Sequence, residues 1–250
     1  MAVIGIDLGT TNSLAGVWQD GKVVLIPNAF GEYLTPSVVG IGKNQEVFVG
    51  SVAKEMLATQ PYDTFREFKR NMGTNFLYGN GRKKYRAEEL SAFVLRRLKE
   101  DAEKFLGEEV TEAVISVPAY FDDNKRNATK NAGRLAGLKV ERLINEPSAV
   151  ALKHHTAERG AESFIVFDFG GGTLDVSLVE AFDNVVEIQA VAGDNYLGGK
   201  DFNEIIAQDF YEQNQISEAY LTKNEQENVL KEAEAVKKEL TDKNEAERQG

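Results

Sequence analysis

Two stretches of the chain share one pattern: residues 3–12 read VIGIDLGTTN, and residues 164–173 read FIVFDFGGGT. In each stretch a short apolar run with β-branched residues predicts a buried strand, and an aspartate and a glycine-rich turn follow it. Further strands are expected after both turns, over residues 12–18 and 22–26 and over residues 174–179 and 185–191. A single strand–Asp–Gly turn is common, but two copies that open the same series of strands indicate an internal repeat.

The spacing of the repeat indicates how the copies are arranged. Asp7 aligns with Asp168, so the copies lie about 160 residues apart. That period is too long for a solenoid, whose repeats run to roughly 20–50 residues. It is typical of two related lobes that face one another.

Helices and strands alternate along the rest of the chain. Gly107 is placed to end an amphipathic helix, Gly137 is placed to end a second helix, and Pro147 stands in the first turn of a third. This alternation predicts an α/β fold. The predicted helices cover residues 88–106, 122–136, 146–155, 201–213 and 224–240, and the intervening strands cover 112–117 and 139–144.

The composition is acidic and excludes several classes of function. The 250 residues include 29 basic and 40 acidic side chains, which gives a net charge of −11. An acidic surface repels nucleic-acid phosphates and anionic membranes, so we expect neither as a partner. The chain has no cysteine, which excludes disulfides, zinc–thiolate sites and iron–sulfur clusters. Without a signal-peptide pattern or an apolar run of about 18 residues, we predict a cytoplasmic protein.

The two glycine-rich turns suit a chain of phosphates. Glycine lets the backbone approach closely, and consecutive N–H groups in such a turn form a concavity that binds anions. Thr10, Thr11 and Thr173 add hydroxyl donors. The turns join strands and so differ from a Walker loop, because the nearest glycine–lysine stretch, residues 193–201, has the wrong spacing and lacks the hydroxyl residue.

Each turn also carries carboxylates, namely Asp7 in the first copy and Asp168 and Asp175 in the second. Mg²⁺ keeps several waters and needs few protein carboxylates, so two aspartates from opposing lobes are able to hold it through water. Alternatively, each aspartate only caps its own turn. The pairing of the two copies favours the magnesium interpretation.

Five motifs resemble those of the 70-kDa heat-shock chaperones, and they cover the whole chain in the order of that family. They read IGIDLGTTNS at residues 4–13, VPAYF at 117–121, INEPSA at 144–149, VFDFGGGTLDV at 166–176 and GDNYLGGKDF at 193–202. The segment between Lys69 and Pro118 is shorter than in the DnaK type. Together with FKRNMG at 68–73 and IPNAFGEYLTPS at 26–37, this shortening resembles the HscC branch of the family.

The resemblance implies an α/β chain with the actin-like ATPase (ribonuclease H-like) fold, with two lobes of which the second is incomplete. Lobe I would span residues 1–163, with subdomain IA at 1–38 and 108–163 and a shortened subdomain IB at 39–107. The partial lobe II would span 164–250, with IIA at 164–200 and the start of IIB at 201–250.

The resemblance implies ATP or ADP and Mg²⁺ as cofactors, and it assigns two residues to the reaction. Lys69 matches a catalytic lysine that contacts the γ-phosphate or the attacking water, and Glu146 matches a carboxylate that positions this water. Without the resemblance, Lys69 beside Arg66 and Arg70 reads as a solvated basic face. Glu146 then reads as a first-turn glutamate favoured by the helix dipole.

The remaining site residues are also assigned by resemblance. Asp7 and Asp168 match the residues that hold Mg²⁺ through water, and Asp168, Thr173 and Asp175 join Lys69 and Glu146 in the catalytic group. The residues that match the phosphate turns are Gly9, Thr10, Thr11, Asn12, Gly170, Gly171, Gly172 and Thr173. Gly198 and Gly199 match a turn beside the nucleotide. The residues that match the helix at ribose and adenine are Glu234, Lys237, Lys238 and Thr241. Without the resemblance, these last four residues read as a solvated helix face.

The mechanism implied is in-line attack of water on the γ-phosphorus, driven by positioning and charge neutralisation without a covalent intermediate. ATP and ADP would favour different angles between the lobes, and a peptide-binding domain absent here would respond to the difference. Pro118 and Arg126 match a pair that relays the nucleotide state. The partners implied are a J-domain co-chaperone, a nucleotide exchange factor and unfolded client peptides.

Three departures from the family pattern stand out. Lys200 replaces a usual glutamate near the ribose, which leaves the sugar contacts unassigned, and Ser148 replaces a usual threonine. His154 and His155 replace an aromatic–glycine pair. They make a weak metal site, because adjacent positions on a helix point apart.

The end of the chain leads to a further expectation. The second adenosine loop and the last strands of lobe II would lie beyond Gly250. We therefore expect an exposed sheet edge with apolar surface, marginal stability, and weak or no ATP binding by this chain alone.

Two other functions remain open from the sequence. An actin-like filament or segregation ATPase would share the two-turn site and would polymerise with nucleotide. A sugar kinase of the same superfamily would need an aspartate base beside a sugar pocket, for which the sequence offers no candidate. Phosphate release measured with and without a J-domain protein separates the chaperone from both.

Overall fold

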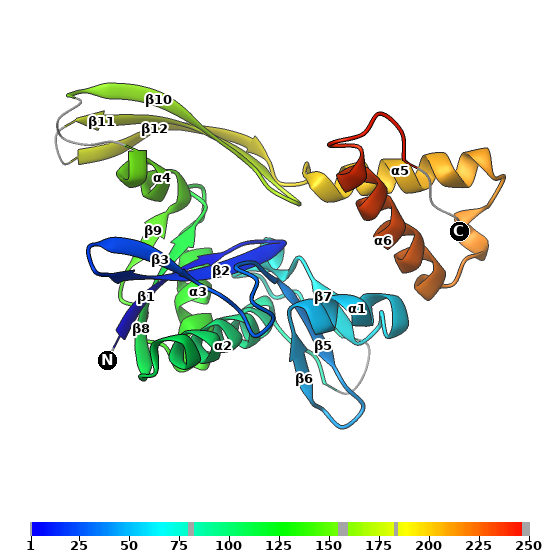
Figure 1. Ribbon diagram of the computed structural model, residues 1–250, viewed down its shortest axis with the longest axis horizontal. Helices are drawn as coiled ribbons and strands as arrows, with labels where there is room; N and C mark the ends of the chain where they lie inside the picture. The colour runs from blue at the N-terminus through cyan, green and yellow to red at the C-terminus, as the bar shows by residue number, and fades with distance from the viewer. Residues whose placement is uncertain (1, 80–82, 155–159, 183–184, 247–250) are drawn as a thin grey trace.

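The computed structural model describes residues 2–79, 83–154, 160–182 and 185–246 (Figure 1). In chain order the elements are β1 (Ala2–Leu8), β2 (Asn12–Gln19), β3 (Lys22–Ile26), β4 (Thr35–Pro36), β5 (Val38–Ile41), β6 (Val47–Val49), α1 (Ser51–Thr59), β7 (Thr64–Arg66), the 3₁₀ helix η1 (Phe68–Asn71), α2 (Ala87–Leu106), β8 (Val110–Val117), α3 (Asp123–Leu135), β9 (Leu143–Asn145), α4 (Glu146–His154), β10 (Glu162–Phe169), β11 (Leu174–Phe182), β12 (Val185–Asp194), α5 (Gly199–Gln213), the 3₁₀ helix η3 (Glu218–Tyr220) and α6 (Lys223–Glu239). This order of strands and helices confirms the predicted α/β class.

The largest sheet of the described chain, here the β1 sheet, has the order β3-β2-β1-β8-β9, with β4 attached to β2. Strand β1 pairs antiparallel with β2 and parallel with β8. Ile4, Ile6 and Leu8 point into the core with the apolar faces of α2 and α3, because side chains alternate along a strand. Asp7 therefore lies on the opposite face of β1.

A second sheet, here the β10 sheet, has the order β10-β11-β12. It repeats the antiparallel series of β1, β2 and β3, as the internal repeat predicts. Helix α4 lies between this sheet and the β1 sheet (Figure 1), where Ala151 packs on Val166 and Val179. The other face of β10 is open, with Ile165 and Phe167 both about two-thirds exposed. This exposed apolar face agrees with the apolar surface expected from the sequence.

The β5 sheet with α1, and the pair of helices α5 and α6, make up two smaller parts of the described chain. The β5 sheet, of order β6-β5-β7, packs on α1. Helices α5 and α6 pack on one another through Ala207, Tyr211 and Ala233. Figure 1 shows α6 beside α1, and the two helices are in contact, so the far end of the chain returns to the β5 sheet.

One predicted strand is shorter in the structure. The sequence predicts a strand over residues 139–144, but β9 covers only Leu143–Asn145, and Lys139 makes a single bridge to Glu112. Glu141 and Arg142 are adjacent charged residues, which breaks the alternation that a strand with one buried face requires.

Candidate functional site

A cavity of about 290 Å³ lies between the two glycine-rich turns. Residues from the β1 sheet, η1, α3, α4 and the β10 sheet line it. They are Asp7, Gly9, Thr10, Thr11, Asn12, Lys69, Arg70, Pro118, Tyr120, Phe121, Lys125, Glu146, Asp168, Gly170, Gly171, Thr173, Asn195 and Tyr196. The structure therefore brings most of the predicted phosphate-binding and catalytic residues to one place.

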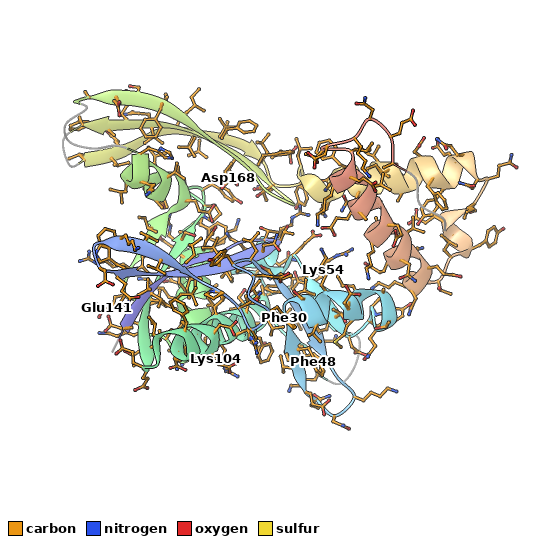
Figure 2. All side chains as sticks on the ribbon, viewed as in Figure 1. Phe30, Phe48, Lys54, Lys104, Glu141 and Asp168 are labelled. Atoms are coloured by element: carbon orange, nitrogen blue, oxygen red, sulfur yellow. The ribbon has the colours of Figure 1, made fainter. Side chains whose placement is uncertain are left out.

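The aspartates of the two copies face this common cavity. Asp7 and Asp168 both line it, and Figure 2 shows Asp168 on the side of the β10 sheet that faces the β1 sheet. Burial raises the pKa of Asp168 above its usual range, and the nearby charge of Asp7 raises it further. Asp7 accepts a hydrogen bond of 2.8 Å from the Ser116 hydroxyl on the neighbouring strand β8. This bond ties Asp7 to β8.

The glycines allow the turns to approach one another. A side chain at Gly171 would run into the Thr11 side chain, and one at Gly198 would run into the backbone of Gly172. A side chain at Gly9 would run into the backbone carbonyl of Asn12. The turns thus need glycine for close backbone approach, which suits a cradle for phosphate groups.

Lys69 and Glu146 form a buried ion pair in the cavity. The Lys69 ammonium lies 2.9 Å from a Glu146 carboxylate oxygen, and Lys69 is only 7% exposed. Burial raises the pKa of Glu146, although the charge and hydrogen bond of Lys69 work against this rise. The interpretation of Lys69 as part of a solvated basic face is wrong, because η1 turns its side chain inward.

Asp175 and Thr173 lie at the second turn. Asp175 lines a small neighbouring cavity with Asp168 and Glu146, while Thr173 lines the main cavity. Burial raises the pKa of Asp175, Asp168 raises it further, and a hydrogen bond from Thr173 lowers it. The carboxylates are therefore close enough to influence one another.

A second cavity of about 470 Å³ adjoins the first, and Thr10, Thr11, Asn12 and Gly171 line both. The ribose and adenine candidates Glu234, Lys237 and Lys238 on α6 line it together with Gly199. Their helix face is therefore directed at a cavity, not wholly solvated. Thr241 is exposed beyond the end of α6 and lines neither cavity, so the structure does not bring this predicted residue to the site.

Ion pairs hold α6 and α1 together across the second cavity. Lys54 lies 2.8 Å from Glu234 and 180 residues before it in sequence, and Figure 2 shows Lys54 on the side of α1 next to α6. Although burial works to raise the pKa of Glu234, hydrogen bonds from Lys238 and Lys54 lower it to about 2. Burial lowers the pKa of Lys237, which donates a hydrogen bond of 2.5 Å to the Gly199 carbonyl.

Lys200, the main departure from the family pattern, has a partner in the structure. Its ammonium lies 2.8 Å from the Glu67 carboxylate, which also accepts from Arg70 at 2.9 Å. Arg70 in turn donates to the Gly172 carbonyl and stacks on the Tyr196 ring. Residues just before and within η1 are thus joined to the second phosphate turn and to α5.

The sequence did not single out several residues of the site. Neither the motifs nor the resemblance assigns a role to Ser116, Glu67, Tyr120 or Lys125. In the structure Ser116 bonds Asp7, Glu67 bonds Lys200, and Tyr120 and Lys125 line the first cavity. Burial raises the pKa of Tyr120, and the charges of Asp175 and Glu146 raise it further. Of these residues, Ser116 is the one whose role has a signal in the sequence. The alternation along β8 puts it beside Asp7 across the parallel ladder.

The remaining predicted residues are placed as follows. Pro118 lines the first cavity, and Arg126 donates to the Phe121 carbonyl at 2.8 Å and to Asn145 Oδ1 at 2.7 Å. Gly172 and Gly198 support the cavities through close approach without lining them. His155 lies outside the described residues.

In the part of the chain that the structure describes, no three acidic or histidine side chains cluster as metal ligands, and no helix is long and apolar enough to cross a bilayer.

The repeated strand–turn units, the facing aspartates and the shared cavity define an α/β protein of the actin-like ATPase class. A family model agrees: the model of the Hsp70 family, described as Hsp70 protein, matches residues 3–80 and 77–249. The chain therefore belongs to the Hsp70 family. Its α/β architecture, with a mixed sheet, is that of an incomplete two-lobed fold. The two matched segments meet at residues 77–80, inside the segment that the sequence indicates to be shortened.

Proposed function

We propose that this chain is the N-terminal part of a chaperone nucleotide-binding domain that binds ATP with Mg²⁺ and hydrolyses it to ADP and phosphate. The observation that carries the proposal is that Asp7 and Asp168, on opposite walls of one cavity, lie together with the buried Lys69–Glu146 pair. A polyphosphate with its metal is the ligand that needs glycine turns, carboxylates and a cation at one point.

The residues present fit a magnesium–nucleotide complex. Mg²⁺, when bound, supplies charge that neutralises the phosphate oxygens. Asp7 and Asp168 would hold it through water, which suits a site with two facing carboxylates. The backbone N–H groups of Gly9 and Gly171 would donate to the phosphates, while the Gly170 N–H closes the turn by donating to the Thr173 carbonyl at 2.9 Å.

The roles in hydrolysis are divided among the buried charged groups. Lys69 would contact the γ-phosphate or the attacking water, and Glu146 would orient that water, because the pair already shares a hydrogen bond inside the cavity. Thr173 and Asp175 would support the same water. The turns would be shaped by Gly172, Gly198 and Gly199. The contacts to ribose and adenine would come from Glu234, Lys237, Lys238 and Thr241. Thr241 would reach them only after α6 is extended or shifted.

In the intact protein, nucleotide state would control a peptide-binding domain. We propose lobe I at residues 1–163 and a partial lobe II at 164–250, with Pro118 and Arg126 as the relay between site and partner domain. A J-domain co-chaperone, a nucleotide exchange factor and unfolded peptides would be the partners, as for the family in general. Membership of the HscC branch, a stress-response role and a cytoplasmic location belong to the same proposal.

The magnesium dependence of ATP binding tests this function. The chain is titrated with ATP in Mg²⁺ and in EDTA, and Asp168→Asn is compared with Asp123→Asn, an exposed position on α3. We expect Mg²⁺ to strengthen ATP binding by the parent chain and by Asp123→Asn, and this gain to be lost in Asp168→Asn. An equal gain in all three proteins would contradict the proposed metal site. Nucleotide-dependent light scattering would instead support a filament-forming ATPase.

A further inference from the structure

Lys125 is a third cation in the first cavity, and no role in the family resemblance falls on it. It stands in the first turn of α3, where its backbone N–H is bonded to the Asp122 side chain at 2.9 Å. Its side chain lines the cavity with Lys69 and Arg70. The position of the backbone is therefore fixed by the helix cap, and the side chain reaches into the site.

The other two cavity cations are compensated by carboxylates. Lys69 pairs with Glu146 at 2.9 Å, and Arg70 pairs with Glu67 at 2.9 Å. Among the residues that the structure describes, no carboxylate lies within ion-pair distance of the Lys125 ammonium. Lys125 thus brings a positive charge to the cavity that its neighbours do not neutralise.

Two aromatic rings hold this charge in place. The Lys125 ammonium lies over the Tyr120 ring at 5.4 Å and over the Phe121 ring at 5.3 Å from their centroids. Lys69 lies over the same Phe121 ring at 5.8 Å. The rings attract a cation without cancelling its charge, so they position the ammonium and leave its N–H donors for an anion.

We propose that Lys125 is a second phosphate-binding lysine, whose ammonium binds the terminal phosphoryl group of a bound nucleoside triphosphate. The inference rests on the proposed function and adds a residue to it. Lys125 lines the same cavity as Lys69, the lysine assigned to the γ-phosphate, and both ammoniums contact the Phe121 ring. A lysine binds phosphate as a point charge, and such a charge-assisted bond is stronger than a neutral one.

Discrimination between ATP and ADP tests the proposal, because only ATP carries the terminal phosphoryl group. The 250-residue chain is titrated with each nucleotide and Mg²⁺, in parallel with Lys125→Gln, Lys125→Arg and the control Lys130→Gln. Lys130 is exposed on the same helix and does not line the cavity, so its substitution makes the same change of charge elsewhere. We expect Lys125→Gln to weaken ATP binding roughly tenfold and to leave ADP binding nearly unchanged. Lys125→Arg and Lys130→Gln should keep the parent ratio.

A chemical measurement on the parent chain supplies a second readout. Acetylation of lysines, followed by mass spectrometry, should show Lys125 protected by ATP but not by ADP, with Lys130 unprotected by both. A chain that binds ATP but loses ATP and ADP affinity equally in Lys125→Gln, or keeps both, would overturn this proposal alone. Because the chain is expected to bind ATP weakly, each titration runs to millimolar nucleotide. An equal gain from Mg²⁺ in the parent chain and in Asp168→Asn would contradict the proposed function and would leave the Lys125 comparison readable.

Discussion

The ammonium of Lys69 and the carboxylate of Glu146 lie 2.9 Å apart inside the cavity, although 77 residues separate them in the chain. Both side chains are largely buried, so each charge depends on the other for compensation. The pair joins η1 to the first turn of α4, and it lies beside the two aspartates.

Replacing Lys69 by methionine should destabilise the folded chain by about 3 kcal/mol near neutral pH, because it leaves the Glu146 charge buried and unpaired. The pKa of Glu146 is raised already, and losing Lys69 raises it further. When the pKa of a carboxyl is higher in the folded state than in the unfolded state, the folded protein loses stability as the pH rises. The loss begins near the ordinary pKa of 4.5 and is complete above the raised pKa of Glu146. Urea unfolding should therefore show the deficit shrinking as pH falls towards 4.5. Adding Glu146→Gln should restore part of the stability, and an equal deficit at all pH values would contradict this account.

The Lys54–Glu234 pair should make the contact between α1 and α6 sensitive to acid. The pKa of Glu234 is lowered to about 2 from an ordinary value of 4.5, so its contribution is present above 4.5 and is lost as pH falls towards 2. Glu234→Gln should cost about 1 kcal/mol at neutral pH and little at low pH. Urea unfolding at several pH values measures this difference, with Glu109→Gln, an exposed glutamate on no helix or strand, as the control. A pH-independent deficit would contradict this account, because it would show that the loss does not come from the charge of Glu234.

Reversing the charge of Lys200 should weaken the link between Glu67 and α5. In Lys200→Glu two carboxylates would replace the ion pair that now spans 2.8 Å, and stability should fall by about 1 kcal/mol because the pair is partly exposed. Lys200→Arg keeps the charge and should behave like the parent chain. Thermal unfolding of the three proteins measures the effect, and high salt should reduce it. Equal stability of Lys200→Glu and the parent would show that the ion pair contributes nothing.

Adding a methyl group at Gly198 should disturb the approach of the second phosphate turn to α5. A β-carbon there would lie 2.5 Å from the Gly172 Cα, and backbone atoms cannot move aside as a flexible side chain does. We expect Gly198→Ala to lower stability by about 1–3 kcal/mol. Gly5→Ala is the matched control, since its nearest neighbour would be the Gly16 carbonyl oxygen at 3.9 Å. Denaturant unfolding compares the two, and equal midpoints would contradict the steric argument.

Most helices and strands were predictable because their patterns are local. The alternation of Ile4, Ile6 and Leu8 predicts the buried face of β1 and places Asp7 on the other face. At β9 the pattern predicts a strand from residue 139, but after the single Lys139 bridge the pairing resumes only at Leu143. Pairing depends on the neighbouring strand as well as on the segment itself.

The paired strand–turn units and their aspartates follow from the amino-acid sequence, because period-2 patterning and glycine act within a few residues of the chain. Which charged side chains find a compensating partner depends on the folded arrangement. Lys69 is buried against Glu146, and Lys200 faces Glu67. Lys125 lies over two rings, with no carboxylate of the described residues in ion-pair distance. Burial and ion pairing depend on contacts between segments far apart in the chain, and a local pattern contains no information about which of several lysines such a contact will reach.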